Sequence, residues 1–86
     1  MIVHAGSVLD DYTRGRRRLE ASGRTVAEVL DDLERRFPGI RFRVVDEQGA
    51  VRPHMRLFVG EEPVTSLQRR LGEHDELHVL GALSGG

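Results

Sequence analysis

One helix is specified strongly by the sequence, and it constrains the fold more than any other feature. Thr25 and Glu28 have the T-x-x-E spacing of a capping box, in which each side chain accepts a hydrogen bond from a free backbone N–H at a helix start. Apolar residues then recur at helical spacing in one stripe, comprising Val26, Val29, Leu30, Leu33 and Phe37. Pro38-Gly39 ends the pattern. The sequence therefore predicts one main amphipathic helix over about residues 25–37, with an apolar face to bury.

Short apolar segments on both sides of this helix predict β-strands. The predicted strands are residues 1–9, 17–21, 54–59 and 76–80. In the second of them, the alternation predicts that Leu19 and Ala21 face the core while Arg18 and Glu20 face water. The connections are predicted as a hairpin tip over 10–18, a short apolar piece over 40–45, turns over 46–49, 60–63 and 72–75, and a short helical turn within 64–71.

The order of these elements predicts an α+β domain. The 86 residues suffice for one small domain. A hairpin, one long helix and further strands favour a β-grasp arrangement, a mixed sheet of four to five strands packed on one main helix. The last strand is expected to lie parallel to the first, because the helix and loops between them form a long crossover. Residues 1–80 are the predicted domain and residues 81–86 a flexible C-terminal tail.

Composition excludes several classes of function. Charged residues make up 31% of the chain, but the net charge is −1, which argues against general nucleic-acid binding. Apolar runs are far shorter than the roughly 18 residues of a membrane span, and no signal-peptide pattern follows Met1. There is no cysteine for disulfides or thiolate metal sites. We expect a cytoplasmic protein that binds neither nucleic acid nor membranes.

The histidines and the arginine run predict no metal site or catalytic group. His74 and His78 have the spacing of a helical zinc pair, but on a strand four residues span about 13 Å, too far to share one ion. Structural roles at the surface are expected for these two and for His4 and His54. The run Arg14 to Arg18 is interpreted as a solvated turn, with docking to an acidic partner as the alternative.

Several segments resemble the ubiquitin-like sulfur-carrier proteins, the group that includes the small subunit of molybdopterin synthase, the thiamin sulfur carrier and a carrier for cysteine biosynthesis. The matching segments are 21–34, 38–46, 52–59, 75–80 and the terminal pair Gly85-Gly86. Gly81 stands where many members of the group have proline, which predicts a looser exit of the tail from the sheet. The resemblance covers nearly the whole chain and implies the ubiquitin-like β-grasp fold.

The resemblance also implies a function for the C-terminus. An E1-like adenylyltransferase that uses ATP and Mg²⁺ would adenylate Gly86, and a sulfur donor (a sulfurtransferase or sulfide) would convert it to a thiocarboxylate. A sulfur-accepting synthase would then take the sulfur for a cofactor, cysteine, tRNA or a secondary metabolite. Gly85 and Ser84 would be needed for threading into the partner. The chain would bind no cofactor and supply no catalytic residue.

The residue types of the tail suit this chemistry. Glycine has no Cβ, so it adopts almost any backbone conformation and leaves the carbonyl open to attack. Residues 81–86 can extend about 20 Å, enough to reach a buried nucleotide. Partner docking is expected on the sheet face opposite the helix, with Phe58, Leu80 and Leu83 as the candidates. The alternative for Phe58 and Leu80 is a place in the core.

All thirteen cationic residues are arginine, and the chain has no lysine. Codon bias is one explanation; the other is protection of the activated terminus from attack by amines on the same protein. In either case no lysine-linked chains of this protein can form. Two further functions remain open, a ubiquitin-like modifier conjugated through Gly86 and a β-grasp module that binds partners without covalent chemistry.

Overall fold

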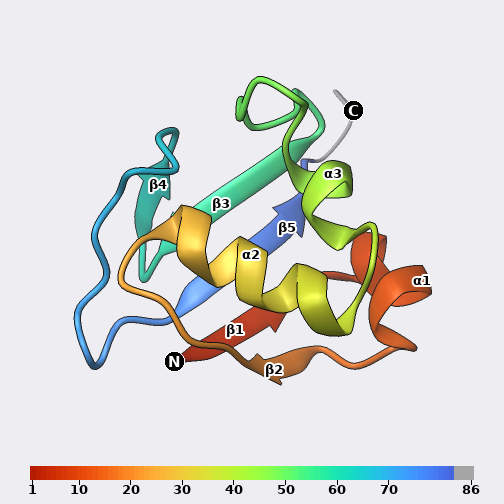
Figure 1. Cartoon of the computed structure of the whole chain (residues 1–86), viewed down its shortest axis with the longest axis horizontal. Coiled ribbons are helices and arrows are strands. Elements are labelled where there is room, and N and C mark those ends of the chain that lie inside the picture. Colours follow the sequence, from red (N-terminus) through yellow and green to blue (C-terminus); the bar gives the residue numbers. More distant parts are fainter. Residues whose placement is uncertain (83–86) are drawn as a thin grey trace.

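The computed structural model describes residues 1–82, which contain five strands in one mixed sheet. The strands are β1 (Ile2–Ala5), β2 (Arg18–Glu20), β3 (Met55–Val59), β4 (Glu62–Val64) and β5 (Leu77–Gly81). The helical segments are the 3-10 turn η1 (Ser7–Leu9), α1 (Asp10–Thr13), α2 (Val26–Arg36) and α3 (Ile40–Val44). Helix α2 lies across one face of the sheet (Figure 1). The predicted β-grasp architecture, a mixed sheet packed on one main helix, is confirmed.

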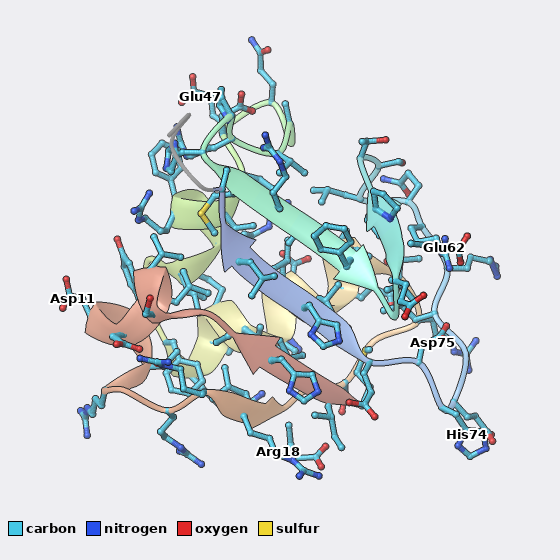
Figure 2. The ribbon with its side chains drawn as sticks, turned by 180° about the vertical axis from the view of Figure 1, so that it is seen from behind. Asp11, Arg18, Glu47, Glu62, His74 and Asp75 are labelled. Atoms are coloured by element: carbon cyan, nitrogen blue, oxygen red, sulfur yellow. The ribbon has the colours of Figure 1, made fainter. Side chains whose placement is uncertain are left out.

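The strand order is β2-β1-β5-β3-β4, so the last strand lies in the middle of the sheet. Strand β5 runs parallel to β1, as predicted, and antiparallel to β3. The two outer pairs, β1 with β2 and β3 with β4, are both antiparallel. Figure 2 looks onto the opposite face, where the strands lie in front of α2. The chain therefore leaves the sheet from its central strand.

Helix α2 begins and ends almost where the sequence predicts. The Glu28 N–H donates to Thr25 Oγ1 at 3.2 Å, as a capping box requires. The Glu28 carboxylate, however, accepts from the N–H of Arg24 at 3.0 Å rather than from Thr25. The first N–H groups of the helix donate to the carbonyls of Arg69 and Leu67. The 64–71 segment thus caps α2, and the predicted short helical turn there is wrong.

The core lies between α2 and the sheet. The apolar stripe of α2 is buried through Val26, Val29, Leu30 and Leu33. Alternate residues of the strands meet it, including Val3, Leu57, Leu77 and Val79. Leu19 and Ala21 are also buried and their neighbours Arg18 and Glu20 are exposed, so the predicted alternation in this strand is confirmed.

The first connection differs from the predicted long strand and hairpin tip. Strand β1 ends at Ala5, and the chain turns through η1 into α1. Leu9 and Thr13 are both buried, and Thr13 Oγ1 donates toward the carbonyls of Leu9 and Arg16. The Thr13 hydroxyl therefore satisfies backbone carbonyls within this turn. An alternating pattern along the sequence does not predict such a role for a threonine.

Two further elements were not predicted. The apolar piece after α2 forms α3, and the Glu34 carboxylate accepts from the N–H groups of Gly39 and Arg41 at 2.8 and 2.9 Å. The predicted turn over 60–63 is shorter, because β4 begins at Glu62. Pro63 lies on this edge strand opposite Phe58. Proline is tolerated on an edge strand because a backbone N–H that faces solvent has no partner there, so its absence in proline costs no hydrogen bond.

Candidate functional site

The root of the C-terminal tail is held by the sheet. Gly81 is the last residue of β5 and lies opposite Met55. The Ala82 N–H then donates to the His54 carbonyl at 2.8 Å, so pairing continues one residue further. A Cβ at Gly81 would lie 3.3 Å from Val8 Cβ, tighter than most such contacts. The predicted looser exit at Gly81 is therefore wrong; glycine here allows η1 to pack closely on the sheet.

The predicted reactive and threading residues follow directly. Leu83, Ser84, Gly85 and Gly86 lie outside the described residues, and their roles stay predictions. Within residues 1–82 the structure fixes only where this segment starts. That point is the end of the central strand, between β1 and β3 (Figure 1).

The other two predicted docking residues lie on the open face of the sheet, opposite α2. Leu80 is 38% exposed, and Phe58 is half-buried outside the core cluster. Alternation along β5 buries Leu77 and Val79 and turns His78 and Leu80 to the open face. The alternative that Phe58 and Leu80 belong to the core is thereby wrong, while their docking role stays a prediction.

A cross-strand row on this face brings together residues that are distant in the sequence. The row runs through Arg18, His4, His78, Phe58 and Pro63. The His4 and His78 rings stack with centroids 4.5 Å apart and planes 12° from parallel. The row joins cationic and aromatic side chains, and Leu80 lies beside it on the same face.

Glu76 fixes one end of the histidine stack. His4 Nε2 lies 2.5 Å from Glu76 Oε1. This hydrogen bond, together with the nearby positive charges, holds the pKa of the Glu76 carboxyl below its ordinary value. His74, which has the spacing of a helical zinc pair with His78, lies in a turn away from this row (Figure 2). The predicted parallel pairing of the first and last strands places His4 and His78 on neighbouring strands, but it does not give the register that stacks their rings.

The described residues contain no group of three or more histidine, cysteine or acidic side chains placed to hold a metal ion. None of the helices within residues 1–82 is long and apolar enough to cross a membrane.

The fold and the central position of its last strand define a ubiquitin-like β-grasp domain. A family model described as the ThiS family matches residues 9–86, and the chain belongs to this family.

Three relatives show how closely the domain is shared. Sulfur carrier protein CysO of Mycobacterium tuberculosis is 29% identical over 85 residues, which cover 93% of this chain and 91% of the relative. A chain in the crystal structure of the Amycolatopsis orientalis BexX/CysO complex is 33% identical, with a TM-score of 0.89 over 99% of this chain and 98% of that one. SAMP1 of Haloferax volcanii, a small archaeal modifier protein, is 26% identical, with a TM-score of 0.75 over 100% and 98%.

Proposed function

We propose that this chain is a sulfur carrier whose C-terminal glycine, Gly86, is adenylated and then converted to a thiocarboxylate. One observation carries the proposal, namely that the ThiS family model matches residues 9–86, which include the terminal Gly85-Gly86; the likeness to CysO over 93% of the chain agrees with it. In this role the chain is a protein cosubstrate that provides the reacting group, and the catalytic residues belong to its partners.

The proposed chemistry has two steps, adenylation by an activating enzyme and sulfur transfer from a donor. A Gly86 carboxylate oxygen attacks the α-phosphorus of ATP, and pyrophosphate leaves with Mg²⁺ neutralising its charge on the activating enzyme. A sulfur nucleophile, sulfide or the persulfide of a sulfurtransferase, then attacks the acyl carbon, and AMP leaves. With sulfide the product is the thiocarboxylate directly; with a persulfide, reduction of the resulting acyl disulfide by a thiol completes the step. Glycine at this position leaves both faces of the carbonyl accessible.

The sheet sets how far the terminus can reach. Ala82 is hydrogen-bonded to His54, so at most the residues from 83 onward can extend into a partner. Four extended residues span at most about 14 Å, shorter than the 20 Å expected when the tail was counted from Gly81. The domain must therefore dock close to the entrance of the activating site. Phe58 and Leu80 on the open face are the proposed contacts, continued by Leu83.

The proposed partners are an E1-like adenylyltransferase, a sulfur donor and a sulfur-accepting synthase. The BexX/CysO complex is consistent with the last of these, because in it a CysO is in complex with another protein. The cytoplasm, where ATP is available to the activating enzyme, is the proposed location.

A second candidate function is a ubiquitin-like modifier joined through Gly86 to lysines of other proteins. The likeness to SAMP1 favours it. Both functions begin with the same adenylate and differ in the nucleophile that attacks it.

Reconstitution with an E1-like adenylyltransferase of the same organism tests the proposal. Wild-type protein should support exchange of labelled pyrophosphate into ATP, and a variant lacking Gly86 should not. With sulfide added, intact mass should show one oxygen replaced by sulfur. Adducts on added proteins in place of this change would establish the modifier. If no such enzyme adenylates the wild-type chain, the protein is a non-covalent binding module and the proposal is wrong.

A further inference from the structure

Three arginines and His54 lie on the elements that flank the root of the tail. Arg43 lies on α3, Arg52 and His54 precede β3, and Arg56 lies on β3 opposite Leu80. His54 is the residue whose carbonyl holds Ala82. Arg43 Nη1 contacts the His54 ring nitrogen, so the Arg43 guanidinium lies beside the residue that holds Ala82. Arg43 is therefore linked through His54 to the point where the chain leaves the sheet, while Arg56 Nη1 donates to the carbonyls of Pro53 and Met55.

An exposed aromatic ring belongs to the same surface. Phe42 on α3 is 56% exposed, the most exposed large apolar side chain in the described residues. The Arg52 guanidinium carbon lies 4.4 Å from the centre of this ring, and Arg52 Nε donates to the Phe42 carbonyl at 2.7 Å. The ring and the guanidinium thus hold each other in a fixed, outward-facing arrangement. We call Phe42, Arg43, Arg52 and Arg56 the collar.

The charge of the collar is not balanced by ion pairs within residues 1–82. The seven ion pairs of the described residues include none of its three arginines. The nearby acids are in the 46–49 turn. The backbone N–H groups of Ala50 and Gln48 donate to Asp46 Oδ1 and hold the pKa of this carboxyl below its ordinary value, with a smaller contribution from Arg52. Glu47 is at the exposed tip of this turn (Figure 2).

A shallow hollow of about 400 Å³ adjoins the collar. It is lined by Tyr12, Gly39, Phe42, Arg43, Arg52 and His54. Its walls combine two aromatic rings with cationic side chains, so it fits a protein side chain that brings an apolar part and a carboxylate.

We propose that the collar docks on a carboxylate-rich rim at the entrance of the adenylyltransferase, and so places the tail at the mouth of the active site. This inference rests on the proposed function. The adenylate forms at Gly86, up to about 14 Å beyond Ala82, so the groups that face the collar belong to the enzyme surface rather than to the nucleotide. Opposite charges at such a rim speed association and set orientation.

The experiment measures pyrophosphate exchange against carrier concentration at several ionic strengths, with an E1-like adenylyltransferase of the same organism. The collar variant is R43E/R52E, and R43Q/R52Q is the milder form. The matched control is R24E/R70E, because both residues are exposed, form none of the described ion pairs and change the net charge equally. Thermal unfolding confirms that each variant is folded.

The collar variant should raise KM about tenfold or more with little change in kcat, and should weaken the salt dependence of kcat/KM. The control should stay within about twofold of wild type. If R43E/R52E and R43Q/R52Q behave like the control while wild type is adenylated, the collar proposal is wrong and the carrier function stands. If wild type supports no exchange, the proposed function itself fails. Binding of a single-stranded RNA oligonucleotide that R43E/R52E abolishes, with exchange unchanged, would overturn the proposal in favour of nucleic acid.

Discussion

Replacing Gly23 by alanine tests how the chain enters α2. Gly23 lies between β2 and α2, against the first turn of the helix. A Cβ there would stand 2.7 Å from Val29 N, 2.8 Å from Glu28 Cβ and 2.9 Å from Glu28 C. Two of these atoms are backbone, so the clash is relieved only by moving the helix start or the incoming segment.

The expected cost of Gly23→Ala is about 3 kcal/mol in the free energy of unfolding, at the upper end of the range for overpacking. The control is Gly60→Ala. Gly60 has φ +59, but nothing lies within 4 Å of its added Cβ. It therefore carries only the conformational cost of alanine in the left-handed region, about 1 kcal/mol.

Urea unfolding followed by circular dichroism measures both values. Both variants should keep the wild-type m-value and differ in midpoint. In thermal unfolding, Gly23→Ala should lower Tm by roughly 15 °C and Gly60→Ala by about 5 °C. Equal losses in the two variants would refute the close packing of Gly23 against α2.

Two more predictions concern the docking face and the response to acid. Phe58→Ala combined with Leu80→Ala should reduce adenylation through KM while lowering stability by about 1 kcal/mol or less per site, because neither side chain belongs to the core; loss of folding instead would contradict their assignment to the open face. The N–H groups of Gly39 and Arg41 hold the pKa of the Glu34 carboxyl below its ordinary value of 4.5. Because this pKa is lower in the folded state, the ionised carboxylate stabilises the fold at any pH above its pKa in the unfolded chain. This contribution is lost as the pH falls below about 5 and the carboxylate becomes protonated. Glu34→Gln should therefore destabilise the protein by about 1 kcal/mol at pH 7, a value discounted for partial exposure, and flatten the acid limb of a pH–stability curve. An unchanged acid limb would show that Glu34 does not hold α3.

The parts of the fold that could be predicted are those set by local chemistry. Thr25 and Glu28 mark the helix start because capping needs residues only a few positions apart. Leu19 and Ala21 face the core because alternation on a strand is strict. The position of Phe58 and Leu80 on the open face follows from the same alternation once the sheet is known.

The parts that could not be predicted depend on contacts between distant residues. Helix α3 is held to α2 by Glu34, and the 64–71 segment forms a turn rather than a helix, with its carbonyls capping α2. The His4–His78 stack requires the register of β1 on β5, which neither strand specifies alone. For the same reason the collar is assembled by folding, since no single segment contains both Phe42 and Arg56.

The state of the C-terminus after activation tests the central claim most directly. The untagged protein is incubated with an E1-like adenylyltransferase, ATP, Mg²⁺ and sulfide labelled with a heavy sulfur isotope, beside a variant lacking Gly86. The C-terminal peptide is then measured by mass spectrometry. The account predicts one labelled sulfur in place of one oxygen on Gly86, and no change in the variant. An adenylated wild-type chain that acquires no sulfur, and is recovered only as hydrolysed carboxylate or as an amide on another protein, would contradict it.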